Sequence, residues 1–412
     1  MNERTQLGWL ARRLGFGLVP GQLDEWEQLG IDAVIDQLVD GDSNGVPPSP
    51  DPFEGLDRRP ENPGRGVGEA SAAWLRHAVS TPRPFEAWVT FFWHDYFAVS
   101  ARVVRAAGFV HDHFRLMASQ GLGNFGDYLA AMTTDAAMLV FLDGNQSSGE
   151  SPNENYGREL LELYSLGVGN YTEDDVRAAS IALTGWTARF RTDEVRFIPR
   201  RHDDTPQTLL GVSGVHDVAT VIDAVVSHPA CAARVAQKVA HAVLGEGADT
   251  AVIARHAETF AADLELRPLF RSLIEDALDG AASEVIIEPV PWFVSCLKAT
   301  GAALRRRDIG RSFEATGQVP LAPPNVGGFP GQLSYLSTAA TISRFNIAST
   351  LAATTPQSSP LFDAARTKQL DVLADAFGID HFSLATNAAL NDLDGGVDVL
   401  AAALASPDLI VA

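Results

Sequence analysis

The sequence predicts an all-α protein, mainly helical with orthogonal or bundle-like packing, that carries one small inserted β-hairpin. Apolar residues recur at helical spacing over most of the 412 residues, and one short segment alternates as a strand does. Hydrophobic residues make up 46% of the chain, which suffices for one large core or two ordinary ones. We therefore expect helices around a substantial apolar interior.

The N-terminal part, residues 1–40, predicts a pair of short helices. Leu23, Trp26 and Leu29 recur at helical spacing after a glycine-containing break. Residues 41–70 are rich in proline and glycine and show no helical period. This composition predicts an extended linker that runs over the surface.

Residues 71–348 are expected to form the main helical domain. Pro84 stands where proline suits a first helical turn, and the residues after it are apolar nearly all round, which indicates a buried helix. Alternation predicts the hairpin near residues 187–199. Residues 349–412 predict a C-terminal helical segment that packs on the same core.

The net charge of −21 bears on the partners of the protein. Such a surface repels phosphate backbones and anionic lipid, so we expect no nucleic acid and no membrane partner. The sequence shows no apolar run of about 20 residues and no secretory signal, which predicts a soluble, cytoplasmic protein. Cys231 and Cys296 stand in apolar helical settings and predict buried thiols.

The common catalytic signatures are absent from the sequence. It contains no G-x-S-x-G elbow, no Walker loop, no H-E-x-x-H and no C-x-x-C. Residues 323–328 predict a rigid loop that could wall a pocket, with Asn325 in a structural turn. Candidate chemistry must therefore come from polar residues in otherwise apolar helices.

One such helix is predicted over residues 152–166. Glu154, Arg158, Glu159 and Glu162 share one arc of it. One interpretation is a solvated face with i,i+4 pairs between Arg158 and the glutamates on either side. In the other, the arc faces a polar cavity, where Glu159 and Glu162 bind one metal ion or Arg158 holds an anionic group.

Two further segments carry histidine. His94 lies in the most aromatic helix, either as a hydrogen-bonded core group or as a ligand or general base, and Asp95 points about 100° away from it. His202 and Asp203 follow the hairpin, either as an exposed histidine and a turn cap or as ligands or an acid/base pair. Together with the two glutamates they would form a mixed nitrogen and oxygen set suited to iron, zinc or manganese.

A calcium loop is a weaker prediction. Ser148 stands where the calcium-binding pattern needs glycine, so a flexible polar connection is the better interpretation of this segment. The residues that match positions 1, 3, 5 and 12 of the pattern are Asp143, Asn145, Ser147 and Glu154.

Several blocks of the sequence carry a family resemblance. The most specific is the run Asn-Glu-Asn-Tyr-Gly-Arg-Glu-Leu-Leu-Glu-Leu at 153–163, and others stand at 92–97, 183–186, 202–203 and 322–326. In order and spacing these blocks resemble the bacterial family known as domain of unknown function 1800, over about residues 7–348. The resemblance implies a sulfatase-like partner protein, and it implies no particular reaction.

The chain departs from that family's pattern at three polar positions, and Phe329 and Tyr335 keep the aromatic bulk of the family but differ in type. The family commonly has a second histidine where Tyr96 stands. After the His-Asp pair it commonly has a glycine and then a lysine, where Thr205 and Gln207 stand. These departures bear on whether the candidate site is catalytically competent.

Two functions follow as hypotheses. The first is a metal-dependent enzyme that acts on a small or oligomeric substrate in a cleft between helices. The alternative is a non-catalytic binding or assembly protein that partners a neighbouring enzyme, and it predicts large stability losses on mutation of Arg158 or Glu162. For the enzyme, the expected catalytic residues are Arg158, Glu159 and His202, and the expected metal ligands are His94, Glu159, Glu162 and Asp203.

Overall fold

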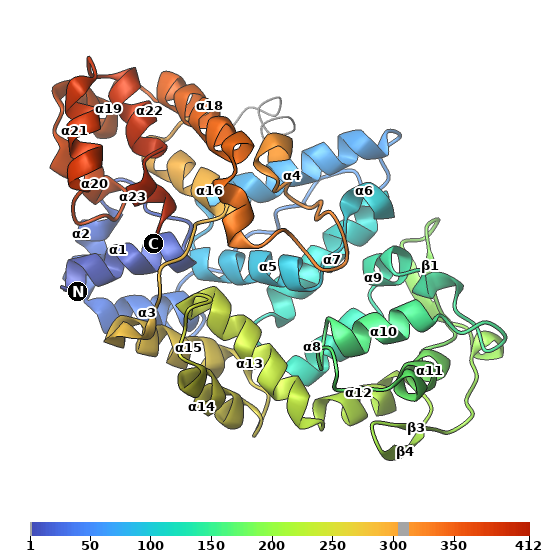
Figure 1. Ribbon diagram of the computed structural model, residues 1–412. Coiled ribbons are helices and arrows are strands. Elements are labelled where there is room, and N and C mark those ends of the chain that lie inside the picture. The colour runs from blue at the N-terminus through green and yellow to red at the C-terminus, as the bar shows by residue number, and fades with distance from the viewer. Residues whose placement is uncertain (1, 304–312) are drawn as a thin grey trace.

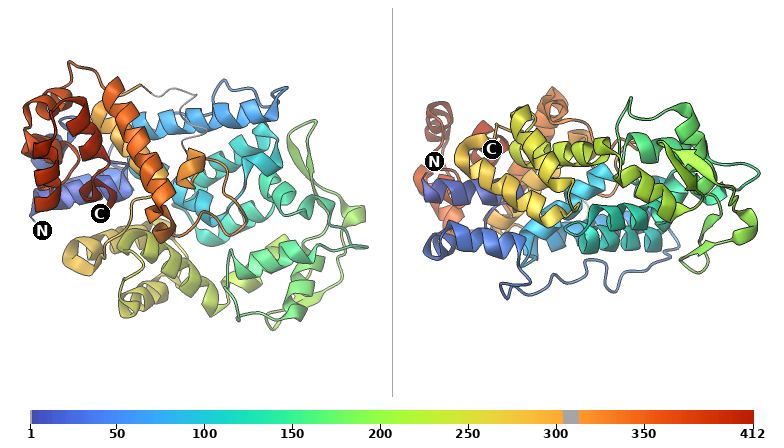
Figure 2. Two further views of the ribbon diagram at one scale, coloured as in Figure 1. Left: turned by 45° about the horizontal axis from the view of Figure 1, so that its top comes forward. Right: turned by 90° about the horizontal axis from the view of Figure 1, so that it is seen from below.

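The computed structural model describes residues 2–303 and 313–412 and confirms a mainly helical fold with a small β content (Figure 1). Buried apolar side chains form one contiguous cluster from Leu7 to Leu409. The C-terminal helices belong to this core and lie beside the N-terminal ones (Figures 1 and 2). A Cβ placed on Gly8 would lie 2.4 Å from the carbonyl oxygen of Gly378, so the two parts touch through their backbones.

The N-terminal part contains three helices where the sequence predicts two: α1 (Glu3–Leu14), α2 (Gln22–Leu29) and α3 (Ile31–Val39). The expected linker ends earlier than predicted, because α4 begins at Pro63. The side chain of Asn62 accepts a hydrogen bond from the Arg65 N–H, and Pro63 suits the first turn that follows.

The centre of the molecule is helical (Figure 1). As predicted, α5 begins at Pro84, and it is buried on nearly every side. The helices of this part are α4 (Pro63–Ser80), α5 (Pro84–Tyr96), α6 (Ala101–Val104), α7 (Ala107–Gln120), α8 (Phe125–Thr133) and α9 (Ala136–Phe141).

The right-hand part of Figure 1 holds α10 (Glu154–Glu162), α11 (Glu173–Ala182) and two hairpins. The predicted hairpin is confirmed as β1 (Trp186–Arg189) with β2 (Glu194–Phe197). A second hairpin, β3 (Gln207–Leu209) with β4 (Val212–Val215), was missed. Its turn residues Leu210 and Gly211 have φ of +53° and +81°, and leucine is uncommon in such a turn, so the sequence carries no clear turn signal there.

Helices resume after the hairpins and continue to the end of the chain. Cys231 and Cys296 are buried free thiols, as predicted. The helices are α12 (Val218–Val226), α13 (Pro229–Leu244), α14 (Thr250–Phe260), α15 (Leu266–Asp276), α16 (Pro289–Thr300), α18 (Thr338–Thr354), α19 (Pro360–Thr367), α20 (Leu370–Ala376), α21 (Leu384–Asp392), α22 (Val397–Leu404) and α23 (Pro407–Ile410), with the 3₁₀ turn η4 (Gln332–Leu336) before α18.

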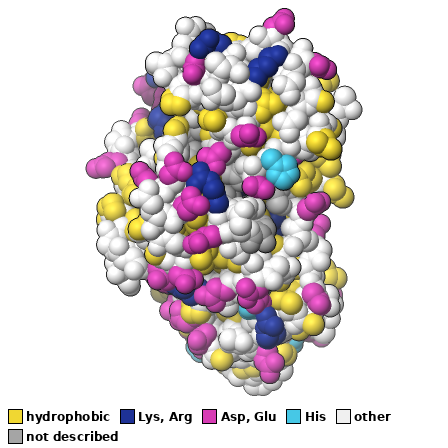
Figure 3. Space-filling view, turned by 90° about the vertical axis from the view of Figure 1, so that its left-hand side faces the viewer, with side chains coloured by type: hydrophobic (Ala, Val, Ile, Leu, Met, Phe, Trp, Pro, Cys, Tyr) yellow, Lys and Arg dark blue, Asp and Glu magenta, His cyan; other side chains and the backbone are white. Residues whose placement is uncertain are grey.

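No single helix among the described residues has both the length and the apolar character that a membrane crossing requires. Helices α12 and α13 meet these requirements only as a pair, which is bent by 76°. Acidic side chains are spread over the face shown in Figure 3, in keeping with the net charge of −21.

Candidate functional site

A cleft of about 350 Å³ lies at the C-terminal ends of α1 and α5. Its other walls are α13, the extended residues 285–288 before α16, and the loop at 327–332. Of the segment 323–328 that the sequence predicts as a pocket wall, Gly327 lines this cleft, and the other wall residues of the loop are the four that follow at 329–332. Three carboxylate side chains (Asp95, Glu246 and Glu288), several cations and a group of aromatic rings face one another there.

Asp95 enters the cleft from the last turn of α5. Its Oδ1 accepts a hydrogen bond of 2.6 Å from the Phe329 N–H. Gly328, with φ of +91°, makes this approach possible, because a Cβ there would lie 2.4 Å from the same oxygen. Burial raises the pKa of the Asp95 carboxyl, and the Phe329 N–H and the charge of Lys238 oppose that shift.

Glu288 enters the cleft from the residue before α16. Its Oε2 accepts a hydrogen bond from the Gln318 amide, whose own oxygen accepts one of 2.9 Å from the Val290 N–H. Burial, followed by the negative charge of Asp95, raises the pKa of Glu288 to about 7. Asp95 and Glu288 therefore titrate as an interacting pair, in which ionisation of one carboxyl opposes ionisation of the other.

The basic side chains of the cleft come from α1 and α13. Arg12 and Arg13 stand in the last turn of α1, and Lys238 and His241 lie on α13. Burial lowers the pKa of Arg12 to about 10 and that of His241 below its ordinary value. Acidic and basic groups thus face each other across one cavity.

Aromatic rings form the apolar wall of the cleft. Trp88, Phe91 and Phe92 come from α5, and Phe329 comes from the loop. Phe91 and Phe329 stack with their ring centroids 6.2 Å apart. These rings give the cleft an apolar wall of low dielectric, which disfavours the ionised carboxylates and contributes to the raised pKa values of Asp95 and Glu288.

His94 occupies the core next to the cleft. The rings of Phe114 and Phe329 lie 4.7 and 5.8 Å from its own, it is fully buried, and neither ring nitrogen has a hydrogen-bond partner among the described residues. Burial, with a smaller contribution from the charge of His113, lowers the pKa of His94 to about 3. His94 therefore faces the aromatic core while its neighbour Asp95 faces the cleft, which agrees with the 100° separation expected from the sequence.

Helix α10, which carries the predicted polar arc, lies in the right-hand part of Figure 1. Arg158 forms a bidentate ion pair with Glu173, at 2.7 Å for each bond, instead of the expected i,i+4 pairs. The Tyr171 hydroxyl donates a hydrogen bond to Glu162. Burial and then the charge of Glu162 raise the pKa of Glu159, which is partly exposed.

His202 and Asp203 have local structural roles after the first hairpin. His202 Nδ1 lies 3.0 Å from the Thr184 carbonyl oxygen. Asp203 accepts a hydrogen bond of 3.0 Å from the Thr205 N–H, and hydrogen bonds with Thr205 lower the pKa of Asp203. These contacts match the interpretation of Asp203 as a turn cap.

The expected convergence of the metal ligands is not observed in residues 2–303 and 313–412. No group of three or more His, Cys, Asp and Glu side chains in these ranges is placed to hold a metal ion. In the calcium-like loop, Asn145 accepts a hydrogen bond from the Ala188 N–H and Ser147 accepts one of 3.1 Å from the Asn153 N–H. This matches the interpretation of that loop as a polar connection.

The three departures from the family pattern also have structural partners. The Tyr96 hydroxyl donates a hydrogen bond of 3.0 Å to the Tyr164 carbonyl oxygen and thereby ties α5 to the segment after α10. Gln207 donates one of 2.8 Å to the Thr205 carbonyl oxygen.

Sequence reasoning set Asp95 aside and missed Glu288. The sequence did carry a signal for Asp95, because this residue belongs to the aromatic block at 92–97. In the structure Asp95 is bound by the Phe329 N–H. Glu288 carries no comparable signal, since its sequence context is typical of a helix start with two prolines.

The comparison with protein families gives one match. The model described as "Protein of unknown function (DUF1800)" matches residues 9–411, nearly the whole chain. Neither a curated protein nor a solved structure matches it.

Proposed function

The chain belongs to the DUF1800 family, and we propose that it is an enzyme whose active site is the cleft of Asp95 and Glu288. One observation carries the proposal: two interacting carboxyls with raised pKa values share a cleft large enough for a small substrate. Two carboxyls whose environments give them different pKa values are suited to general acid and general base catalysis at neutral pH.

The two carboxyls have different roles in this proposal. Glu288, with its pKa raised to about 7, is partly protonated at neutral pH and acts as the general acid. The Phe329 N–H and Lys238 favour the ionised form of Asp95, which acts as the general base. In a hydrolysis, Asp95 accepts a proton from the attacking water while Glu288 donates its own to the leaving oxygen. Exchange of one proton with solvent restores the starting state.

The test uses a diazo reagent, which esterifies protonated carboxylic acids, followed by peptide mapping. At pH 6.5 we expect Glu288 to be esterified well ahead of the surface carboxylates, with labelling that falls as pH rises through about 7. Asp95→Asn is expected to reduce this labelling, because removal of the neighbouring negative charge lowers the pKa of Glu288. Labelling of Glu288 no faster than that of exposed Glu258 would contradict the proposal.

Metal dependence remains a separate prediction. The metal form of the hypothesis rests on His94, Glu159, Glu162 and Asp203, and elemental analysis of protein purified without chelators tests it. Bound iron, zinc or manganese at one ion per chain would support it.

A second candidate function, a non-catalytic binding or assembly role, is favoured by one surface feature. Leu333 and Leu336 in η4 and Ile342 and Phe345 in α18 are large apolar side chains that are 51–77% exposed. Exposed apolar groups of this kind mark protein-binding surfaces. Leu333→Glu with Phe345→Glu should abolish co-purification of a partner, such as the sulfatase-like protein that the family resemblance implies, without altering labelling of Glu288.

A further inference from the structure

The last turn of α1 brings two adjacent arginines, Arg12 and Arg13, to the cleft. Arg12 donates to the main-chain oxygens of Asp408 and Val411, at 3.3 and 3.0 Å. Arg13 donates to those of Ser283 and Ala412, at 3.1 and 2.9 Å. Main-chain oxygens thus accept these hydrogen bonds, and no ion pair with a carboxylate side chain is found for either arginine among the described residues.

Several of their N–H groups are also unsatisfied. Arg13 is 5% exposed, and its Nε and Nη2 have no hydrogen-bond partner within the described ranges, nor does the buried Nε of Arg12. A buried cation with unpaired donors is costly unless an anion compensates it. The carboxylate of Asp408 lies near Arg12 but is already bound by the Ser383 N–H at 3.0 Å and by the Thr386 hydroxyl.

The cleft is where an anion could reach this pair. Arg12, Arg13 and Lys238 all line it, and Lys238 is exposed at its rim on α13. Glu246 also faces the cleft and is exposed, but it forms no ion pair with these cations in the described part of the chain. Planar guanidinium groups bind carboxylate and phosphate through paired N–H donors, and a lysine adds a point charge.

We propose that Arg12, Arg13 and Lys238 form an oxyanion-binding end of the cleft, and that the substrate carries a terminal carboxylate or phosphate that docks there. The statement that the bound anion is part of a substrate rests on the proposed active site. The oxyanion-binding end can be tested apart from catalysis, because anion binding needs no turnover.

The experiment titrates the full chain with inorganic phosphate and, separately, with succinate, in buffers whose ionic strength is held constant with chloride. We expect saturable binding by calorimetry of at least one of these two anions. In Arg12→Gln and in Lys238→Gln the dissociation constant should rise about tenfold, as expected for loss of one charge-assisted hydrogen bond. Tighter binding of phosphate would indicate a phosphorylated substrate, and tighter binding of succinate a carboxylate-bearing one.

Arg4→Gln is the matched control, because it removes the same charge from the same helix at a site with acidic partners. It should leave anion binding unchanged. Equal weakening in Arg4→Gln and Arg12→Gln would overturn the proposal, as would the absence of saturable binding of both anions, since Arg12 and Arg13 would then serve only to stabilise the end of the helix.

Asp95→Asn separates this inference from the proposed function. It removes a negative charge from the cleft, so anion binding should persist or strengthen. In the wild type, absence of preferential Glu288 labelling together with saturable anion binding would contradict the proposed acid/base pair and leave the oxyanion-binding end intact. Preferential labelling of Glu288 in the wild type without saturable anion binding would support the acid/base pair and overturn the oxyanion-binding end.

Discussion

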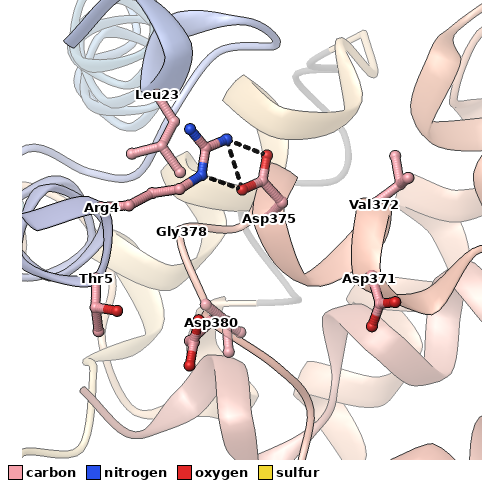
Figure 4. Close-up of a pocket in the computed structure, with 9 residues that line it drawn as sticks. Arg4, Thr5, Leu23, Asp371, Val372, Asp375, Gly378 and Asp380 are labelled. Carbon is pink, nitrogen blue, oxygen red and sulfur yellow. Dashed lines mark hydrogen bonds and ion pairs between the residues drawn. The ribbon is translucent and has the colours of Figure 1, made fainter. Parts of the chain in front are cut away.

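The two ends of helix α1 present arginine in opposite environments. At the N-terminal end, Arg4 borders a hollow of about 390 Å³ beside α20, and its guanidinium pairs with Asp375 through two bonds of 2.8 Å (Figure 4). Asp24 and Glu27 of α2 accept its remaining bonds, at 2.8 and 2.5 Å. At the C-terminal end, Arg12 and Arg13 meet main-chain oxygens and retain unpaired N–H groups.

The two environments shift the pKa of arginine in opposite directions. Burial lowers the pKa of Arg4, but its hydrogen bonds with Asp24 and Asp375 raise it further, to a value above the ordinary one. Burial and the charge of Arg12 lower the pKa of Arg13 to about 9. The Arg4 guanidinium is therefore paired with three carboxylates, whereas Arg12 and Arg13 form no ion pair with a carboxylate side chain among the described residues.

The largest expected effect is on catalysis. Asp95→Asn should reduce turnover by about 10²- to 10⁴-fold, because it removes a general base. The measurement is hydrolysis of a panel of chromogenic esters, phosphates and glycosides. Asp375→Asn makes the same chemical change in the Arg4 hollow and should leave turnover unchanged. An equal loss of turnover in both variants would contradict the assignment of Asp95 as the general base.

The next effect concerns acid stability, since His94 is buried and its ring nitrogens have no hydrogen-bond partner among the described residues. Its folded pKa of about 3 is below the unfolded value of 6.5, so its contribution to stability is present above pH 6.5 and is lost as pH falls towards 3. Between pH 7.5 and 5 we expect a loss of about 2 kcal/mol from this histidine. Urea unfolding of His94→Leu should show a shallower decline, and exposed His381→Gln should follow the wild type.

A smaller effect is expected at Arg4. Its partners are 45–66% exposed, so Arg4→Gln should cost about 1 kcal/mol of unfolding free energy at low salt. The cost should shrink in 1 M NaCl, where the screening length is about 3 Å. A cost that does not depend on salt, measured by urea unfolding, would mean that the hollow is held by packing and not by its charges.

The smallest effect is expected at Arg158. Its ion pair with Glu173 lies at the surface, so Arg158→Gln should leave the thermal midpoint close to that of the wild type. A decrease as large as that of Arg4→Gln would favour the binding or assembly hypothesis, which requires a fold-specifying network at this position.

Sequence patterns predicted most of the fold because helices are encoded locally. The proline at 84 and the apolar residues after it marked α5, and alternation marked the first hairpin, as the structure confirms. The second hairpin, β3 with β4, was not predicted, since Leu210 stands in its turn where hairpins commonly have asparagine or aspartate. The pairing of Asp95 with Glu288 joins segments almost 200 residues apart, and no local pattern encodes such a pairing.

The sequence by itself determined that the chain is helical, that His94 and Asp95 point in different directions, and that the segment at 323–328 can wall a pocket. Only the tertiary structure decided which of these groups share a cavity, because the separation in space of two distant side chains depends on how the helices pack. For the same reason it was packing that placed acidic partners around Arg4 and brought Arg12 and Arg13 to main-chain oxygens beside the cleft.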